Sequence, residues 1–293
     1  MSIVIDAHQH FWDPARADYP WMQGAEMAPL RRAFGPADLA PLLAENGVDA
    51  SIVVQCRSSL EETEEFLQIA AATPFVAGVV GWADLTEPSL GDHLRRLRAL
   101  PGGKKLIGIR HQVHDEPDPE WLLRSDVQRG MAAVFAHDLA YDLLVRSREL
   151  PAAIATARAF PKGRFVLDHV AKPPIAEGFS QQWADRLAML GGCGNVWCKI
   201  SGLATEAVWD DWDADRLFPV IAHAAKCFGE DRLIFGSDWP VCLLAGNYGV
   251  IKRAFDECLA RLDTAGLDTA GLGPHFREKA LGANAREAYR LPI

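Results

Sequence analysis

Eight short runs of strand-forming residues, separated by amphipathic segments, set the tightest limit on how this chain can fold. We predict strands at Ile3–His10, Ala50–Cys56, Val76–Asp84, Leu106–His111, Tyr141–Arg146, Arg164–His169, Asn195–Ile200 and Leu233–Asp238. Strands that alternate with helices indicate a parallel sheet. Eight such units within 293 residues predict a single (β/α)₈ barrel domain over residues 1–293. The alternative is a doubly wound open sheet, but no G-x-G-x-x-G motif follows the first run.

Composition narrows the range of partners. The net charge is −9 and no Lys/Arg-rich run offsets it, so we expect no nucleic-acid partner. No apolar run approaches the roughly 20 residues of a membrane span, and the first residues enter a strand without a basic leader. The six cysteines show no C-x-x-C spacing and read as buried, reduced thiols. We therefore expect a cytoplasmic protein without a membrane partner. The sequence gives no indication of the number of subunits.

Ionisable or aromatic residues close nearly every predicted strand. They are His8, His10, Cys56, Trp82, Asp84, Arg110, His111, Arg146, Asp168, His169, Lys199 and Asp238. Active sites of (β/α)₈ barrels lie at the carboxyl ends of the strands. Surface charge that merely solubilised the protein would not follow strand ends so regularly, so this pattern predicts an enzyme. A non-catalytic barrel that only binds a partner is the less favoured alternative.

Strand alternation predicts which of these side chains converge. His8 and His10 share one face of the first strand with Asp6, and Asp238 shares a face of the last strand with Gly236. The first and last strands are neighbours in a closed barrel, so both imidazoles and the Asp238 carboxylate are predicted to meet.

Other polar residues near the strand ends are assigned by the same reasoning. His169 is predicted to face inward, whereas Asp168 points the other way and reads as structural. Asp6 either orients an imidazole or is simply a capped polar residue. A histidine at a strand end can also be a half-buried residue that bonds a loop. The remaining histidines are predicted to lie at the surface: His93, His114, His137, His223 and His275.

Several motifs together resemble the amidohydrolase superfamily. They are His8-Gln9-His10-Phe11-Trp12, Gly108-Ile109-Arg110-His111, Leu167-Asp168-His169-Val170-Ala171-Lys172-Pro173, Lys199-Ile200-Ser201-Gly202-Leu203, Phe235-Gly236-Ser237-Asp238-Trp239-Pro240 and Gly282-Ala283-Asn284-Ala285-Arg286. The chain looks most like the lactonase branch, which hydrolyses sugar lactones such as L-fuconolactone and L-rhamnonolactone. That branch also includes pyrone-dicarboxylate and muconolactone-type lactonases.

The resemblance also implies a set of metal ligands. Metal-dependent members carry H-x-H on strand one, lysine or glutamate on strand four, histidines on strands five and six, and aspartate on strand eight. His8, His10, His169 and Asp238 match, but strand four ends in Arg110-His111 and strand five ends near Arg146. A binuclear centre is therefore not expected. A single divalent ion such as zinc on His8, His10 and Asp238 stays open, although the branch includes members that work without metal. We predict that no cofactor is required.

For a lactonase, we hypothesise the following roles for these groups from the chemistry of ester hydrolysis. Asp238 would take a proton from water, its basicity raised by partial desolvation at the barrel mouth. His8, His10 and His169 would position that water and the lactone carbonyl. Arg110, helped by His111, would stabilise the oxyanion. Lys199 is the alternative for that role, or it would bind a substrate hydroxyl.

Substrate recognition is predicted from aromatic residues near the mouth. Trp21, Trp82 and Trp239 would contact a sugar ring, although each would equally suit packing against the barrel rim. A pyrone or aromatic-acid lactone would instead need several arginines, which Arg57, Arg110 and Arg146 could supply. A metal-dependent decarboxylase of the same superfamily is a further alternative, because its H-x-H and terminal aspartate look similar.

Overall fold

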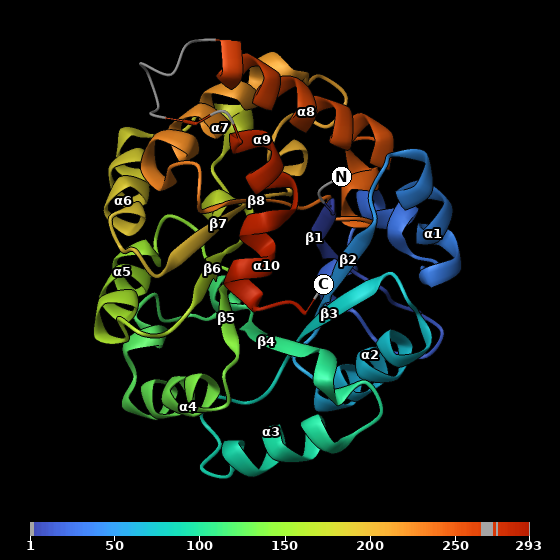
Figure 1. The fold of residues 1–293 in the computed structure, drawn as a ribbon, viewed down its shortest axis with the longest axis vertical. Coiled ribbons are helices and arrows are strands. Elements are labelled where there is room, and N and C mark those ends of the chain that lie inside the picture. The colour runs from blue at the N-terminus through green and yellow to red at the C-terminus, as the bar shows by residue number, and fades with distance from the viewer. Residues whose placement is uncertain (1–2, 265–271, 274, 293) are drawn as a thin grey trace.

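The computed structural model describes residues 3–264, 272–273 and 275–292, and it forms one parallel eight-stranded sheet with strands in chain order (Figure 1). The strands are β1 (Ile5–Gln9), β2 (Ala50–Val54), β3 (Val76–Gly81), β4 (Leu106–His111), β5 (Ala140–Leu143), β6 (Phe165–Leu167), β7 (Val196–Ile200) and β8 (Leu233–Phe235). Each strand pairs with the next in parallel register. The predicted (β/α)₈ barrel is confirmed.

The barrel closes between β1 and β8, through hydrogen bonds between the end of β1 and the residues that follow β8. The Asp238 amide donates to the His8 carbonyl over 2.8 Å, and the His10 amide donates to the Trp239 carbonyl over 2.7 Å. Several predicted strands are too long. In the structure Arg146, His169 and Asp238 lie in the loops that follow β5, β6 and β8.

Helices surround the barrel. They are α1 (Pro36–Glu45), α2 (Leu60–Ala72), α3 (Leu90–Ala99), α4 (Ser125–Ala136), α5 (Leu150–Ala159), α6 (Gln181–Gly191), α7 (Ala214–Phe228), α8 (Tyr248–Thr264), α9 (Phe276–Glu278) and α10 (Asn284–Tyr289), with a π-helical turn at Lys279–Ala283. Helix α7 shows why these segments pack inward. It buries Leu217, Val220, Ile221, Ala224 and Phe228, which share one face at intervals of three and four residues.

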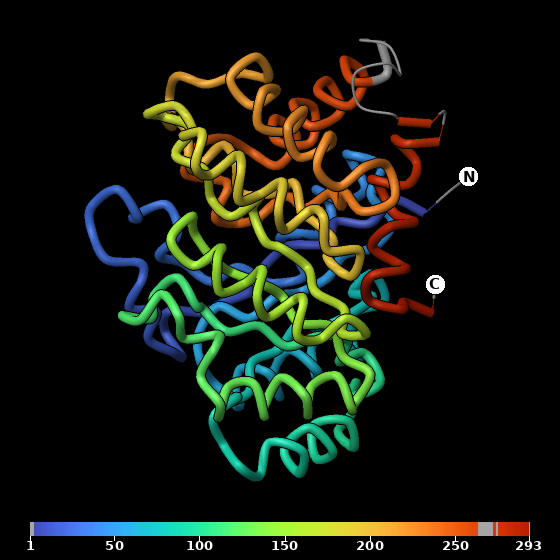
Figure 2. The backbone as a smooth tube through the Cα atoms, turned by 90° about the vertical axis from the view of Figure 1, so that its left-hand side faces the viewer, coloured from blue at the N-terminus to red at the C-terminus, as the bar shows by residue number. Residues whose placement is uncertain are grey.

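The inside of the barrel is a second, smaller core. Its apolar side chains include Ile5, Ile52, Val80, Val166, Trp197 and Ile234, together with Ala285, Ala288, Tyr289 and Leu291 from the C-terminal end of the chain. Helix α10 therefore covers one mouth of the barrel (Figure 1). In the side view the segment between β1 and α1, drawn in blue, projects at the opposite mouth (Figure 2). The open mouth is thus the one at the carboxyl ends of the strands.

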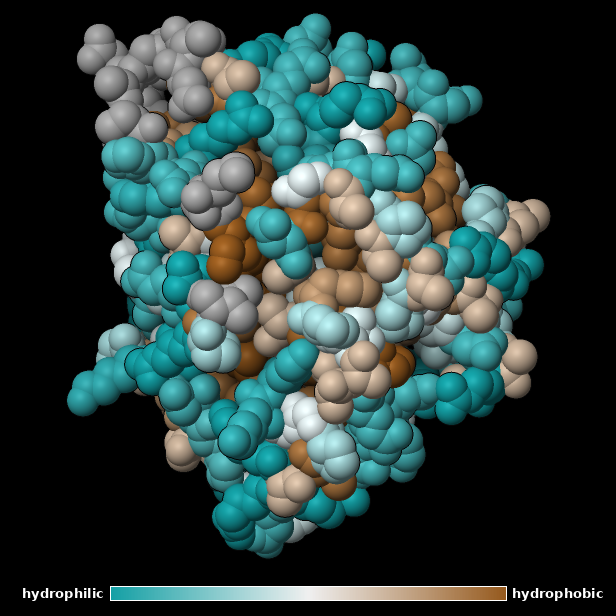
Figure 3. Space-filling model, turned by 45° about the vertical axis from the view of Figure 1, so that its right-hand side comes forward, coloured by the Kyte–Doolittle hydropathy of each residue, from teal (hydrophilic) through white to brown (hydrophobic). Residues whose placement is uncertain are grey.

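The surface is mainly polar. Four large apolar side chains are exposed among the described residues: Leu123, Phe179, Met189 and Val208. Figure 3 shows one face with hydrophilic side chains around its edge and hydrophobic ones in the middle.

All six cysteines are free thiols. Over the part of the chain that the structure describes, no helix has the length and apolar character to cross a bilayer.

Candidate active site

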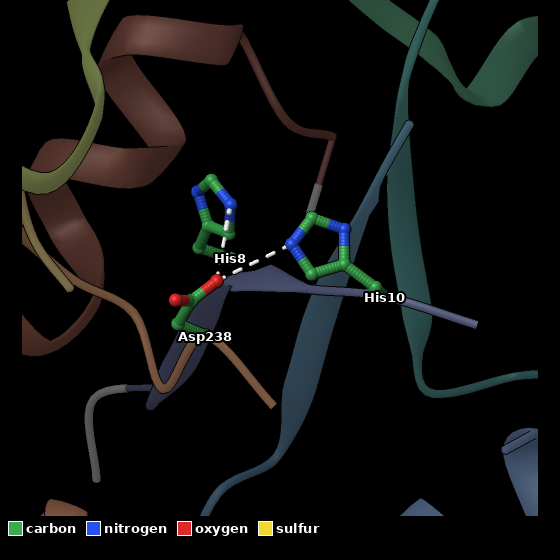
Figure 4. Close-up of side chains that lie close together, drawn as sticks. All are labelled: His8, His10 and Asp238. Atoms are coloured by element: carbon green, nitrogen blue, oxygen red, sulfur yellow. Dashed lines mark hydrogen bonds and ion pairs between the residues drawn. The ribbon is translucent and has the colours of Figure 1, made fainter. Parts of the chain in front are cut away.

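Three imidazoles surround one carboxylate oxygen at the open mouth of the barrel. The Oδ1 atom of Asp238 lies 3.3 Å from His10 Nε2, 3.7 Å from His8 Nε2 and 4.0 Å from His169 Nε2. Figure 4 shows His8 and His10 converging on this oxygen from the end of β1. All four side chains are buried. The predicted convergence of His8, His10 and Asp238 is therefore present, and His169 joins it.

Left-handed backbone conformations after β6 and β8 help to bring His169 and Asp238 to the site, which the alternation of side chains along a strand does not explain. After β6, His169, Val170, Ala171 and Lys172 all have positive φ angles between 48° and 58°, and Asp238 has φ 58°. A left-handed conformation is costly for non-glycine residues and is often found at functional sites. Gly236 makes room for β1. A Cβ atom there would lie 2.6 Å from the His8 Cβ.

The prediction that Asp168 points away from the site is wrong. Its Oδ2 atom accepts from Arg110 Nη1 over 2.9 Å, and its Oδ1 atom lies 3.0 Å from Lys199 Nζ and 3.3 Å from His8 Nδ1. Asp168 follows Val166 on the inner face of the barrel, and the left-handed turn then swings His169 into the mouth as well. Both residues thus reach the site.

Asp6 does not share the inner face with His8, contrary to prediction, because the register of β1 shifts between Asp6 and Gln9. The Asp6 carboxylate accepts from the Ser237 hydroxyl over 2.6 Å and from the Tyr248 hydroxyl of α8 over 3.0 Å. Its Oδ1 atom also accepts from the backbone amides of His8 and Ser237. Asp6 is therefore a capped polar residue that ties β1 to the loop after β8.

A cavity of about 160 Å³ opens onto the histidine cluster. Of the predicted site residues it is lined by His10, Arg110, His169, Asp238 and Trp21. A larger hollow of about 490 Å³ lies between the Trp12–Gly35 segment and α2, but none of the clustered histidines lines it. We take the smaller cavity as the candidate active site because the ionisable groups converge there.

Four predicted substrate contacts lie outside the lining of this cavity. Lys199 is fully buried below it between two carboxylates. His111 accepts from Trp82 Nε1 over 3.0 Å and bonds Glu116 over 2.7 Å. Trp239 is buried and its ring contacts Phe34. Substrate contact by these residues stays a prediction, and the contacts that the structure shows are with other parts of the protein.

The cavity is also lined by residues that were given no catalytic or substrate-binding role from the sequence. They are Cys56, Gln112, His114, Asp115, Leu144, Lys172 and Val241. His114, predicted to lie at the surface, is largely buried, and this burial lowers its pKa to about 4. Lys172 bonds Glu206 over 2.9 Å. Lys172 belongs to the Leu167–Pro173 motif given above, so that motif was the sequence feature that could have identified it. Cys56 and Leu144 lie within predicted strand segments, whereas Gln112, His114, Asp115 and Val241 lie on loops whose path the sequence does not reveal.

Burial and neighbouring charge set the protonation states of the cluster. Burial lowers the pKa of His8 and of His169 well below the usual range, so both are neutral at neutral pH. Burial also pushes the pKa of Asp238 upward, but the neighbouring His169 and His10 outweigh it and hold this pKa below its usual value. The expected rise in Asp238 basicity is therefore wrong. The carboxylate is ionised, the form that can accept a proton.

The cluster also has the donor set of a metal site. One ligand atom from each of His8, His10 and Asp238 lies within 4.8 Å of the others. His10 Nδ1 bonds the Val54 carbonyl over 2.7 Å, which places its hydrogen on Nδ1 and leaves the Nε2 lone pair facing Asp238. Histidines that ligate metals typically donate their other ring N–H in this way. These residues are compatible with a single divalent ion, although Arg110 Nη1 lies 3.2 Å from His8 Nε2.

The barrel, with ionisable side chains that converge at the carboxyl ends of its strands, has the architecture of (β/α)₈ enzymes. The chain belongs to the amidohydrolase family, which it matches over residues 5–291.

Named relatives extend this assignment. The chain is 42% identical to an L-fucono-1,5-lactonase of Burkholderia ambifaria, over 99% of this chain and 97% of that protein. It is 38% identical to an L-fucono-1,5-lactonase of Burkholderia multivorans, with the same coverage of each. A crystal structure of an amidohydrolase from Burkholderia multivorans with bound zinc superimposes with a TM-score of 0.91. That protein is 36% identical and the match covers 99% of this chain and all of that one.

Proposed function

We propose that this protein is a lactonase that hydrolyses sugar lactones of the L-fucono- or L-rhamnonolactone type to aldonic acids. The observation that carries the proposal is the ionised Asp238 carboxylate, ringed by three imidazoles on the wall of a small cavity. The relatives of 42% and 38% identity, both L-fucono-1,5-lactonases, support the same activity.

The charges around the cavity favour a neutral lactone. Arg110 is paired with Asp168 and Arg57 with Glu62. Arg146 and Lys172 share the single carboxylate of Glu206, at 3.4 Å and 2.9 Å, which leaves one positive charge in excess. Asp115 adds a carboxylate to the lining. A pyrone dicarboxylate would bring two negative charges and would need cations that are not already neutralised. This pairing supports a sugar lactone over the pyrone alternative.

The proposed reaction needs one general base and one oxyanion contact. A water molecule attacks the lactone carbonyl carbon while its proton passes to Asp238 Oδ1, and the carbonyl oxygen becomes an oxyanion. Arg110, on the cavity wall, stabilises that negative charge. The tetrahedral carbon then expels the ring oxygen, which takes the proton back from Asp238 as the C–O bond breaks. The product is the open-chain aldonic acid.

The imidazoles position the reactants in this scheme. His169 is held by a hydrogen bond between Nδ1 and the Ser201 hydroxyl over 2.9 Å, and His10 is held by the Val54 carbonyl. Both rings line the cavity with defined orientations, as positioning of water and carbonyl requires. A divalent ion held by His8, His10 and Asp238 would, when bound, polarise the carbonyl and acidify a bound water.

A pH-indicator assay with L-fucono-1,5-lactone and L-rhamnono-γ-lactone, with and without a chelator, tests the proposal. Asp238→Asn removes the proton acceptor, so we expect turnover to fall by about 10²- to 10⁴-fold. The thermal midpoint should change little. Asp185→Asn, an exposed carboxylate on α6, is the matched control and should retain full activity.

Each outcome of this assay has a separate meaning. Activity that is lost on chelation and restored by zinc would assign water activation to the metal rather than to Asp238 alone. Absence of turnover on any sugar, pyrone or muconate lactone would overturn the lactonase proposal. Carbon dioxide release from an aromatic acid by the metal-loaded protein would favour the decarboxylase instead.

A further inference from the structure

A column of buried charges runs beneath the histidine cluster, and of its members the reaction scheme above uses only Arg110. Lys199 Nζ lies 2.6 Å from Asp142 Oδ2 and 3.0 Å from Asp168 Oδ1. Arg110 Nη1 donates to the other oxygen of Asp168. At the foot of the column the Tyr289 hydroxyl of α10 donates to Asp142 over 2.7 Å. Lys199, Asp142, Asp168 and Tyr289 are almost completely buried.

This column touches the active site through both ring nitrogens of His8. Nδ1 lies 3.3 Å from Asp168 Oδ1 and 3.3 Å from Lys199 Nζ, whereas Nε2 lies 3.2 Å from Arg110 Nη1. A neutral imidazole carries one hydrogen, so one nitrogen must donate and the other must accept. The groups around His8 decide which nitrogen carries the hydrogen.

The tautomer with its hydrogen on Nδ1 satisfies more of these contacts. It gives up only the 3.3 Å contact with Lys199 Nζ, whose hydrogens have Asp142 and Asp168 as acceptors. With the hydrogen on Nδ1, His8 would donate to Asp168 Oδ1 over 3.3 Å, beside the Lys199 ammonium 3.0 Å from the same oxygen. Nε2 then accepts from Arg110. With the hydrogen on Nε2, two N–H groups would face each other at the Arg110 contact. The acceptor left for Nε2 would be Asp238 at 3.7 Å, beyond hydrogen-bond distance.

We infer that Asp168 and Arg110 are positioning residues that hold His8 in the Nδ1–H tautomer, so that no N–H of His8 points at Asp238. This inference rests on the proposed function for its consequence. If His8 donated to Asp238 Oδ1, it would occupy a lone pair that the attacking water needs. The Asp238 carboxylate thus stays available to accept the proton of the attacking water. The same tautomer leaves Nε2 as the atom that could ligate a metal.

Nitrogen NMR of chelator-treated protein carrying ¹⁵N-labelled histidine tests this directly. The chain has nine histidines, and the signals of His8 are those that disappear in His8→Gln. We expect a protonated Nδ1 and an unprotonated Nε2 in the wild type. In Asp168→Asn, the hydrogen should move to Nε2. The kcat for a sugar lactone should fall about 10- to 100-fold, as is usual when a partner of a site histidine is removed.

The effect on KM separates positioning from direct contact. Asp168 does not line the cavity, so KM should change less than threefold in Asp168→Asn, and Asp185→Asn should alter neither readout. A wild-type His8 protonated on Nε2 would overturn the inference, as would an Asp168→Asn protein that keeps the Nδ1–H signature. If Asp168→Asn does not fold, the wild-type spectrum alone still decides the tautomer.

The two proposals fail independently. The NMR measurement uses no lactone, so a protein that turns over no lactone but shows the Nδ1–H form would lose the proposed function and keep this inference. An active lactonase with His8 protonated on Nε2 would lose only the inference.

Discussion

Replacing Lys199 measures how strongly the barrel depends on its buried charges. The ammonium group is fully buried 2.6 Å from Asp142 and 3.0 Å from Asp168. At an effective dielectric constant of about 20, Coulomb's law gives about 6 kcal/mol of attraction for each pair before the cost of desolvation. Lys199→Met keeps much of the aliphatic stem but leaves the two carboxylates without this cation. Breaking a buried pair in this way costs about 3–5 kcal/mol, and we expect the free energy of unfolding to fall by that amount.

Lys279→Met is the matched control. Lys279 also makes two ion pairs, both 2.6 Å long, with Glu230 and Asp231, but Lys279 and Glu230 are partly exposed to solvent and Asp231 is largely exposed. Exposed pairs contribute about 0–1 kcal/mol. Urea denaturation followed by circular dichroism should therefore separate the variants clearly. Equal losses in the two proteins would refute the reasoning that burial, rather than pair distance, determines the contribution.

The pH dependence gives a second check on Lys199→Met. Burial already raises the pKa of Asp142 to about 6 with Lys199 present, and removal of the cation should raise it further. Acidification protonates the stranded carboxylate and removes its charge. The stability gap between wild type and Lys199→Met should therefore narrow as the pH falls from 7 to 5. A gap that stays constant would contradict this account.

Two further predictions concern single positions. Because the pKa of Asp142 is higher in the folded protein than in the unfolded chain, the wild type should lose stability as the pH rises from about 4 to 6. Asp142→Asn cannot titrate, so its unfolding free energy relative to wild type should increase over that window in urea titrations. Gly202 has φ +60°, and a Cβ there would lie 2.6 Å from His169 Nδ1 and 2.9 Å from Asp238 Oδ2. Gly202→Ala should therefore destabilise the fold by about 1–3 kcal/mol and sharply lower kcat, whereas Gly194→Ala, where a Cβ meets nothing within 4 Å, should do neither.

The barrel could be predicted because its signal is distributed along the whole chain. Eight apolar runs alternate with amphipathic segments, and burial of both sets of faces leaves few other architectures. The convergence of His8, His10 and Asp238 could also be predicted, since closure of the barrel places the first and last strands side by side. The helix that covers the other mouth, α10, was not recognised as part of the inner core, because its apolar residues resemble those of any amphipathic helix.

Strand alternation failed where the backbone leaves the extended conformation. The register shift in β1 separates Asp6 from His8, and the left-handed run from His169 to Lys172 brings Asp168 and His169 to the same site. That run contains no glycine, so the sequence carried no sign of it. Asp142 was overlooked for a different reason. It lies within β5, among residues that read as ordinary buried strand, and its partners come from β7 and α10.

The pairing of charges beneath the cavity also bears on how the proposed reaction would end. Arg110 and Lys199 are balanced by Asp142 and Asp168, so the floor of the site adds little net charge. A neutral lactone therefore enters without electrostatic cost, but hydrolysis creates a carboxylate beside Asp238. Two negative charges about 4 Å apart repel by about 4 kcal/mol at an effective dielectric constant of about 20. A free arginine in the floor would cancel this repulsion and hold the product. Because Arg110 and Lys199 are already paired with carboxylates, the site instead favours release of the aldonate. In this scheme negative charge is stabilised mainly in the transition state, where the oxyanion forms beside Arg110.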